Sequence, residues 1–417
     1  MLYFIGLGSN LGNREYTLNS AIRMLNELGE IVGVAPFYYS PAQGYESPNE
    51  FCNTVVAIRS CFIPKQVLYM CLEVEKQFGS RPHSVLQPDG TKQYTDRLLD
   101  VDVLTAYNDA GLEVEVNNKR LTLPHPRMAE RDFVQQPLIR MAHRTIHETE
   151  LPFVKMHGLG NDYIYFDCTE DVTAMLLLPV VRHFAPLWCD RHRGIGGDGL
   201  VFIMRDSKAD LRMRIFNADG SEAEMCGNAA RCVGYYAKLT GLTDGNQLSL
   251  ATKGGLRKIE VRDAEHIAVE MGRPKMLDSQ EIDGRTYHCV DVGNPHAVTI
   301  LDETEMLTPA LVHTVGPLIE NHPLFPNRTN VEFCVVMNRH EVAMRVWERG
   351  SGETQACGTG ATATAVACIR QGLCDSPVTV HLLGGNLTIE NTGRVTRMIG
   401  PAEVVYAGAF EQFNTND

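Results

Sequence analysis

One motif occurs twice in this sequence, and the two copies align without a gap at a spacing of 131 residues. The first copy (residues 214–231) contains Cys226, and the second (residues 345–362) contains Cys357. In each copy a strand-like run leads into a Gly-rich turn, then Cys-Gly, then a helix of small residues. This order predicts that each thiol lies at a helix N-terminus, where the helix dipole and the free N–H groups favour a thiolate.

The duplication extends beyond the cysteines, because Gly160-Asn161 and Gly293-Asn294 are 133 residues apart. We therefore expect two similar halves, about 152–272 and 273–413, each with strands around a central helix. An approximate two-fold axis between the halves would place the two cysteines on opposite sides of one cleft. A single Cys in an Ala-rich helix is more often a small buried residue. Two cysteines in matched Gly-flanked turns instead indicate a catalytic role.

A thiolate and a thiol on opposite faces of one carbon can remove a proton on one side and return it on the other, which inverts a stereocentre. The sequence has no lysine in a recognisable pyridoxal motif and no flavin or nicotinamide fingerprint, so the site itself must stabilise the carbanion. Backbone N–H groups at the two helix starts suit a substrate α-carboxylate. Glu348-Arg349 and the asparagines of this half suit a second amino-acid head.

The length of 417 residues predicts two or three domains. No secretion signal and no apolar run of membrane-spanning length is visible. The twelve cysteines form no CxxC pair, which predicts reduced thiols in a cytoplasmic protein. The net charge of −13 argues against a nucleic-acid partner.

Residues 1–142 are predicted to form the first domain. Alternating and helical apolar spacings place strands at about 2–7, 31–39, 51–58 and 98–105, helices around 18–28 and 67–78, and a hairpin at Asn117-Asn118. The order β-α-β-β-α-β is that of a ferredoxin-like sandwich, so the fold class is α+β. The polar, His-rich residues 143–151 are expected to be a short linker or a frayed helix before the second domain, 152–413.

Asp100 and Asp102 are the strongest candidates for chemistry in the first domain. On a strand, residues i and i+2 face the same way, so both carboxylates leave one face while Val101 and Val103 enter the core. Two adjacent hard oxygen ligands can hold Mg²⁺ against a nucleotide phosphate chain. For Asp-x-Asp alone, a solvated strand face is the commoner explanation.

Five motifs of the first domain resemble 6-hydroxymethyl-7,8-dihydropterin pyrophosphokinase. They are Gly-Leu-Gly-Ser-Asn-Leu-Gly at 6–12, Ser40-Pro41, Pro-Asn-Glu-Phe-Cys-Asn at 48–53, Arg97-x-x-Asp100-x-Asp102, and the run from Leu-Pro-His-Pro to Phe-Val at 123–134. The resemblance implies a ferredoxin-like fold, ATP with two Mg²⁺, and transfer of pyrophosphate to the pterin hydroxymethyl group for folate synthesis.

The resemblance also implies roles for individual residues. Asp100 and Asp102 match the metal ligands. The positions that match the pterin slot are Ser40, Phe51, Asn53 and Phe133. Those that match ATP contacts are Glu75, Arg97, His125 and Arg131.

The sequence departs from this family after the second helix. Members usually carry Gly-Arg-x-Arg there, whereas this chain reads Gly79-Ser80-Arg81-Pro82-His83. Tyr94 stands where the family often has an aromatic lid residue. Two hypotheses follow, an active pyrophosphokinase and a silent N-terminal scaffold domain.

Residues 152–413 closely resemble diaminopimelate epimerase, through the two cysteine motifs and the run Lys155-Met-His-Gly-Leu-Gly-Asn161-Asp. The resemblance implies an isomerase without pyridoxal phosphate that interconverts L,L- and meso-diaminopimelate for lysine and peptidoglycan synthesis. Cys226 and Cys357 match its acid/base pair. The positions that match substrate contacts are Asn161, Asn217, Asn294, Asn330, Glu348 and Arg349, with Gly227, Asn228, Gly358 and Thr359 around the α-carboxylate.

Two positions of this half carry further expectations. His296 matches a family position near the catalytic pair, where a positioning role without proton transfer fits equally well, and some members carry Gln at Gly199. A proline or hydroxyproline racemase is the alternative function. The asparagines and Glu348-Arg349, which suit a second charged head, argue against it. The resemblance is compatible with a homodimer through this half.

Overall fold

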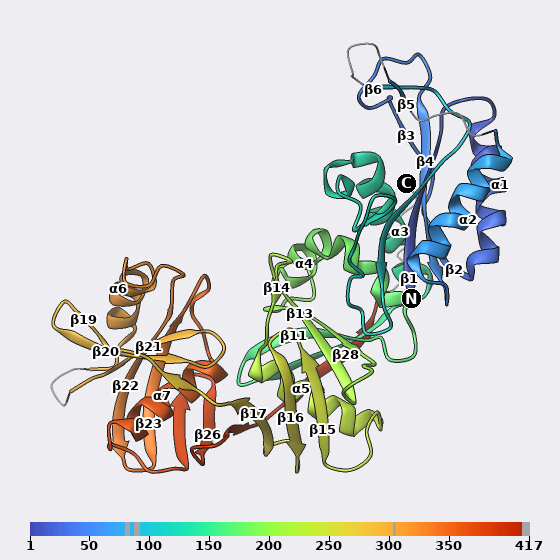
Figure 1. Ribbon diagram of the computed structural model, residues 1–417. Helices are drawn as coiled ribbons and strands as arrows, with labels where there is room; N and C mark the ends of the chain where they lie inside the picture. Colours follow the sequence, from blue (N-terminus) through green and yellow to red (C-terminus); the bar gives the residue numbers. More distant parts are fainter. Residues whose placement is uncertain (80–83, 87–91, 303–305, 411–417) are drawn as a thin grey trace. The chain divides into compact units, whose positions relative to one another are not determined.

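The computed structural model in Figure 1 describes residues 1–417 except 80–83, 87–91, 303–305 and 411–417. Ser80, Arg81 and His83 of the altered loop therefore lie outside the described residues. The chain divides into two compact units. The first comprises Met1–Pro152, Asp167–Phe184 and the residues from Ala409, and the second comprises Phe153–Phe166 and Ala185–Gly408. Within the described part of the chain, no helix is long and apolar enough to cross a membrane.

The first unit is built on an antiparallel sheet with the strand order β2-β4-β1-β7, in which β3 also pairs with β4. Helix α1 packs on β1 and β4, α2 packs on β7, and α3 packs on β2, β3 and β4. The strands are β1 (Leu2–Ser9), β2 (Glu30–Val34), β3 (Tyr38–Ser40), β4 (Phe51–Arg59) and β7 (Asp100–Tyr107), and the helices are α1 (Arg14–Leu25), α2 (Pro64–Gln77) and α3 (Asp132–Glu148). Every residue of β4 from Phe51 to Ile58 is buried, so both faces of the sheet are covered there.

The short elements of this unit lie at its connections. They are η1 (Asn26–Leu28), the paired strands β5 (Ser84–Leu86) and β6 (Lys92–Tyr94), the hairpin β8 (Val116–Asn117) and β9 (Thr122–Leu123), and η2 (Met128–Glu130). The hairpin predicted at Asn117-Asn118 is confirmed. The predicted strand at 31–39 is wrong in one respect, because β2 ends at Val34 and β3 starts at Tyr38. Pro36 lies in the gap, and proline has no N–H for the ladder.

Most of the predicted linker is helical, because α3 continues to Glu148. One face of α3 is buried, through Val134, Pro137, Leu138, Met141, Ala142 and Ile146. The segment η3 (Thr173–Val180), followed by α4 (Val181–Cys189), packs against α3. Since η3 is apolar on every side, it is buried from Ala174 to Leu178. Residues 167–184, which the sequence placed in the second domain, therefore complete the core of the first unit.

The strands of the second unit, β10 to β28, form one closed set of pairings. Those outside the two cysteine copies are β10 (Pro152–Gly158), β11 (Asn161–Asp167), β12 (Gly199–Met204), β16 (Gly255–Val261), β17 (Ile267–Gly272), β18 (Lys275–Met276), β19 (Gln280–Ile282), β20 (Arg285–Asp291), β21 (Pro295–Ile300), β22 (Asn330–Asn338), β26 (Gly385–Asn391), β27 (Thr396–Gly400) and β28 (Glu403–Ala409), with helix α6 (Pro309–Glu320).

The two cysteine copies have the same local topology. In the first, β13 (Leu211–Asn217) pairs antiparallel with β14 (Glu222–Ala223) and parallel with β15 (Gln247–Thr252), and α5 (Gly227–Thr240) connects β14 to β15. In the second, β23 (Glu341–Glu348) pairs in the same way with β24 (Gly352–Glu353) and β25 (Val378–Leu382), and α7 (Gly358–Arg370) is the connection. Strand β17, which follows the first copy, pairs with β27, which follows the second. Helices α5 and α7 are buried in one shared core.

The first testable prediction concerns the contact between η3 and α3. Leu176 is fully buried, and a Cβ added to Gly33 of β2 would lie 3.5 Å from Leu176 Cδ1 and 3.1 Å from Met141 Sδ of α3. Replacing Leu176→Ala should lower the free energy of unfolding of the first unit by about 2–5 kcal/mol, because a cavity replaces apolar contacts. Native-state hydrogen exchange of the α3 amides measures this loss. The half-exposed Leu72 is a matched control, and an equal effect of Leu72→Ala would contradict the assignment of η3 to this core.

Candidate functional site

Cys226 and Cys357 are the N-cap residues of α5 and α7. In both copies the preceding strand ends in a tight antiparallel turn, and the helix starts with a glycine. The placement of each thiol at a helix N-terminus is thus as the sequence predicts. The first N–H groups of both helices lie beside the sulfur atoms, and helix starts of this kind suit an anionic group.

The two helix starts meet on one side chain. A Cβ added to Gly227 would lie 2.7 Å from Met398 Cε, and one added to Gly358 would lie 2.6 Å from Met398 Sδ. Asn228 connects the copies as well, because its Nδ2 donates a 3.1 Å hydrogen bond to the carbonyl of Ala356, the residue before Cys357. Glycine at both positions therefore allows the two cysteine turns to share one site.

The predicted residues of the first copy gather around Cys226. The Cys226 thiol donates to Asn161 Oδ1 at 3.3 Å, and Asn228 Nδ2 donates to the same oxygen at 3.1 Å. Asn217 is exposed at the end of β13, where its Nδ2 donates to Ser221 Oγ at 3.0 Å. In the register of β12 and β13 it lies opposite Gly199.

The second copy surrounds Cys357 with hydrogen-bonding groups. The Gly360 N–H donates to its Sγ at 3.4 Å, and the Thr359 hydroxyl lies 3.5 Å from the same atom. Asn294 Nδ2 donates to that hydroxyl at 3.4 Å, and Asn294 Oδ1 lies 2.9 Å from His296 Nε2. This chain of contacts joins His296 to Cys357 through two intervening side chains.

Asn330, Glu348 and Arg349 adjoin this cluster. Asn330 is paired with His296 in the register of β21 and β22, and its Oδ1 accepts the Arg349 backbone N–H at 2.9 Å. The Arg349 guanidinium donates to the carbonyl of Asn327 at 3.1 Å. Glu348 accepts a hydrogen bond from the Thr354 hydroxyl.

Burial changes the chemistry expected of the two thiols. It raises the pKa of Cys226 above its ordinary value of 9.0 in spite of N–H groups from the start of α5. Burial raises the pKa of Cys357 well above 9.0, and the negative charges of Glu348 and Glu332 raise it further. The N–H groups at the start of α5 favour the Cys226 thiolate, as the sequence predicts, but desolvation outweighs their effect. Burial likewise raises the pKa of Glu348.

Several residues of this site were not found from the sequence. Glu332 is fully buried beside His296, with Oε1 2.6 Å from Nδ1. Glu332 lies two residues after Asn330 on the same strand, so the two side chains face the same way. This spacing is the sequence signal that could have indicated Glu332. Tyr163 is buried against Gly199, where an added Cβ would lie 3.0 Å from Tyr163 Cε1 and 2.1 Å from the carbonyl of Phe216. A side chain at Gly199 therefore requires the backbone to move.

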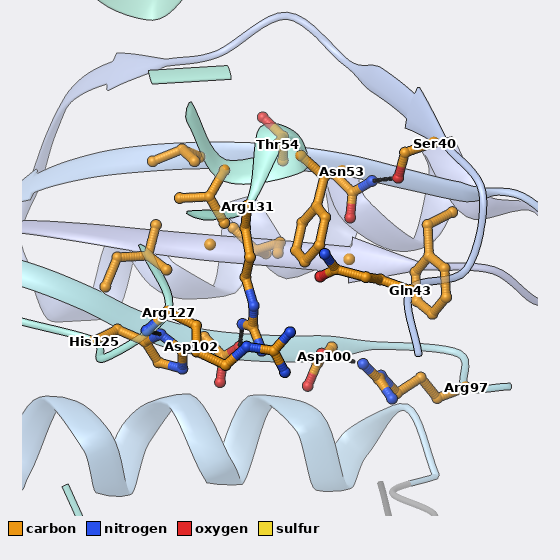
Figure 2. A pocket seen from close by; sticks show the side chains of 18 of the residues that line it. Ser40, Gln43, Asn53, Thr54, Arg97, Asp100, Asp102, His125, Arg127 and Arg131 are labelled. Atoms are coloured by element: carbon orange, nitrogen blue, oxygen red, sulfur yellow. Dashed lines mark hydrogen bonds and ion pairs between the residues drawn. The ribbon is translucent and has the colours of Figure 1, made fainter. Parts of the chain in front are cut away.

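The first unit has a separate pocket of about 220 Å³. Figure 2 shows Asp100, Asp102 and the surrounding cations along one side of it and Asn53 with Ser40 on the other. The predicted residues that line it are Ser40, Phe51, Asn53, Phe133, Arg97, Asp100, Asp102, His125 and Arg131. Glu75 is placed elsewhere, since its buried carboxylate accepts the backbone N–H of Val101 at 2.7 Å.

The charged groups along this side of the pocket are paired. Arg97 Nη2 lies 2.6 Å from Asp100 Oδ2, and Arg131 Nη1 lies 3.9 Å from Asp102 Oδ2. Burial lowers the pKa of His125, and the nearby positive charges of Arg131 and Arg127 lower it further. His125 is therefore neutral at pH 7 and can accept or donate a hydrogen bond without adding charge.

The loop beside the pocket is tied by an aspartate that the sequence did not indicate. Asp96 accepts hydrogen bonds from Asn10 Nδ2 at 2.7 Å, Tyr45 Oη at 2.9 Å and Asn49 Nδ2 at 2.7 Å. Burial acts to raise the pKa of Asp96, but these donors together with Ser47 outweigh it and bring the pKa to about 2. These residues are far apart in the chain, so no local pattern shows the network.

The raised pKa values predict slow alkylation of both site thiols in the free enzyme. The rate of Cys226 labelling by iodoacetamide should still be rising at pH 9, because only the thiolate reacts and burial raises the pKa above 9.0. Mass spectrometry of labelled peptides measures the rate at each pH. Cys61, which is exposed, should react faster at neutral pH. A plateau for Cys226 below pH 8 would contradict the dominance of burial.

Comparison with known proteins gives two family matches. Residues 153–277 and 288–405 match the family described as diaminopimelate epimerase, and residues 4–143 match 7,8-dihydro-6-hydroxymethylpterin-pyrophosphokinase. Diaminopimelate epimerases from Acetivibrio thermocellus and Pseudomonas syringae pv. tomato are 45% and 44% identical, over 61% and 62% of this chain and 97% and 98% of theirs. A solved phenazine biosynthesis protein of the PhzF family from Bacillus anthracis has 16% identity and a TM-score of 0.48 over 62% of this chain and 97% of that one.

Proposed function

Since this chain belongs to the diaminopimelate epimerase family and also carries a pyrophosphokinase segment, we propose that it is an enzyme with two working activities. The first is epimerisation of L,L-diaminopimelate to meso-diaminopimelate by Cys226 and Cys357 without a cofactor. The second is Mg²⁺- and ATP-dependent pyrophosphoryl transfer to 6-hydroxymethyl-7,8-dihydropterin. The observation that carries the first is the convergence of two Cys-Gly helix starts on Met398.

In the proposed epimerisation, one cysteine takes the α-proton as a thiolate while the other gives a proton from its thiol. The first N–H groups of α5 and α7, with Asn228 and Thr359, receive the α-carboxylate and stabilise negative charge as it develops. Asn294 holds the Thr359 hydroxyl, and His296 holds Asn294, which supports a positioning role for this histidine.

The distal end of the substrate is assigned to the polar groups beside the second cysteine turn. Arg349 offers a cation and Glu348 an anion, and these match the carboxylate and the ammonium group of a second amino-acid head. A proline-type racemase substrate has no such head. The arrangement of these groups with Asn330 therefore supports diaminopimelate over a cyclic imino acid.

Replacing either cysteine should remove epimerisation. We expect Cys226→Ser and Cys357→Ser each to lower kcat by about 100- to 10,000-fold, because each removes one of the two proton-transfer groups. Conversion of L,L-diaminopimelate followed by chiral chromatography measures the rate. Cys289→Ser, at a buried cysteine outside this site, is the control. Near-normal turnover by either site variant would refute the two-base mechanism.

The pocket of the first unit supports the transferase activity. Asp100 and Asp102 lie on one face of β7 between the cations Arg97 and Arg131, and this donor set fits Mg²⁺. Among the described residues no group of three or more metal-binding side chains occurs, so the remaining ligands would come from phosphate and water. A bound Mg²⁺ would neutralise phosphate charge, while Arg97 and Arg131 orient the phosphate chain.

The opposite side of the pocket fits a flat heterocycle. Phe51 and Phe133 supply aromatic faces, each with an arginine above the ring, at 5.2 Å for Arg97 and 5.5 Å for Arg131. The Asn53 amide donates to Ser40 Oγ at 3.0 Å and lies at the pocket wall, where it can hydrogen-bond a pterin edge. The antiparallel sheet with helices on it supports a ferredoxin-like fold for this domain, and the matched topologies of the cysteine copies support an approximate two-fold in the other.

Release of AMP tests the transferase activity and the alternative of a silent scaffold domain. The full-length protein with ATP, Mg²⁺ and 6-hydroxymethyl-7,8-dihydropterin should release AMP, and Asp100→Ala should lower the rate at least about 100-fold, because it removes a predicted metal ligand. The epimerase rate of the same sample is the control and should not change. AMP absent from the unaltered protein while epimerisation continues would establish the scaffold hypothesis instead.

A further inference from the structure

The amide of Asn161 makes a polar contact at each of its two ends. Its Nδ2 donates to Asp198 Oδ2 at 2.7 Å. Its Oδ1 accepts from the Cys226 thiol at 3.3 Å and from Asn228 Nδ2 at 3.1 Å. Asp198, which neither the sequence motifs nor the proposed mechanism uses, is therefore one amide away from a catalytic sulfur.

The orientation of this amide follows from chemistry at its Asp198 end. Asp198 Oδ2 also accepts the backbone N–H of Asp162 at 3.1 Å, and Oδ1 receives Arg191 Nη2 at 2.8 Å. Burial raises the pKa of Asp198, while Arg191 and the two N–H donors favour its ionised form, which can only accept. The nitrogen of Asn161, and not its oxygen, must therefore face Asp198.

The other end of the network imposes the same direction. The carbonyl oxygen of Ala356 can only accept, so Asn228 must present its nitrogen there. Its second N–H then points to Asn161 Oδ1. Both neighbours consequently require the Asn161 oxygen to face Cys226, independently of how amide atoms are assigned.

We propose that Asp198 is a positioning residue that, through Asn161, holds Cys226 as a thiol in the substrate-free enzyme. An amide oxygen accepts a hydrogen bond from S–H and disfavours a thiolate at the same place. N–H groups act on both sulfurs, from Gly360 on Cys357 and from Asn228 and Ala229 on Cys226. Because Asn161 Oδ1 also accepts from the Cys226 thiol, this thiol rests as a proton donor, and the turnover direction that needs it as a base must break the Asn161 contact. Only this last step rests on the proposed function.

Asp198 is itself held by a charged network. Arg191 binds Asp162 through both terminal nitrogens, at 2.7 and 3.1 Å, and Lys155 lies 2.9 Å from Asp162. Besides Asn161, the titratable and charged groups around Cys226 are Tyr163 and Tyr165 of β11, Arg231 and Cys232 of α5, and Glu348 of β23. Around Asp198 they are Asp162, Arg191 and Cys189. Tyr163 faces both ends of the network, because Asn161 hydrogen-bonds its hydroxyl and the charge of Asp198 acts on it as well.

The test is the pH dependence of Cys226 alkylation in the full-length protein without substrate. Asp198→Asn keeps the shape but no longer fixes the Asn161 nitrogen, so the amide is held only through Asn228 and its contact with the sulfur weakens. The midpoint of iodoacetamide labelling, followed by mass spectrometry from about pH 6 to about pH 10, should fall by about 0.5–1 unit, because a weaker acceptor contact favours the thiol less. Asp198→Ser, which also removes the fixed acceptor, should shift the midpoint in the same direction and serves if the first variant does not fold.

Arg191→Gln is the matched control. It removes the ion pair of Asp198 but leaves the carboxylate that orients Asn161, so the midpoint should not fall. An unchanged midpoint in Asp198→Asn and Asp198→Ser, or an equal fall in Arg191→Gln, would overturn the proposal. Because labelling needs no diaminopimelate, the positioning role can fail while epimerisation is intact, and it can hold if the proposed substrate is wrong.

Discussion

The second unit depends on the packing of two helix starts against Met398. This side chain is fully buried, and the two glycines that follow the cysteines leave no room for a Cβ beside it. Arg231 also contacts this side chain, with Nη1 3.5 Å from Met398 Sδ, and its Nε donates to the carbonyl of Pro401 at 2.9 Å. A larger residue at either glycine would separate the turns, and the site needs both turns close together. The small residues of α5 and α7 are thus a condition for the chemistry as well as for the core.

Local geometry could be predicted from the sequence more completely than contacts between distant parts of the chain. Matched Cys-Gly turns were enough to place Cys226 and Cys357 at helix N-termini, because a helix start has local signals. Strand alternation likewise placed Asp100 and Asp102 on the pocket side of β7. The packing of η3 on α3 joins distant parts of the chain, and no periodicity within either segment indicates its partner. The raised thiol pKa values escaped prediction for the same reason, since burial depends on every neighbour.

Glu75 shows where a motif position and a structural position differ. It directly follows Val74 of the buried stripe of α2, and its carboxylate caps the Val101 N–H between the two pocket aspartates. In this place it orders the strand that carries Asp100 and Asp102. Under the proposed function, Glu75 would contribute to nucleotide binding by fixing the strand of Asp100 and Asp102, although it does not line the pocket. Sequence spacing alone could not separate this role from direct contact, because both require a residue at the same position of the helix.

Burial of the cysteines has a cost and a benefit for proton abstraction. Each unit of raised pKa disfavours the thiolate by about 1.4 kcal/mol at fixed pH, but it also makes that thiolate a stronger base toward a weakly acidic Cα–H. The negative charges of Glu348 and Glu332 near Cys357 add to the cost in the free enzyme. An amino-acid substrate brings an ammonium group into this negative field, and its positive charge offsets the penalty only when it is bound. In the proposed reaction the thiols are therefore least ionised in the empty site and more ionised in the occupied one, which protects them from other electrophiles.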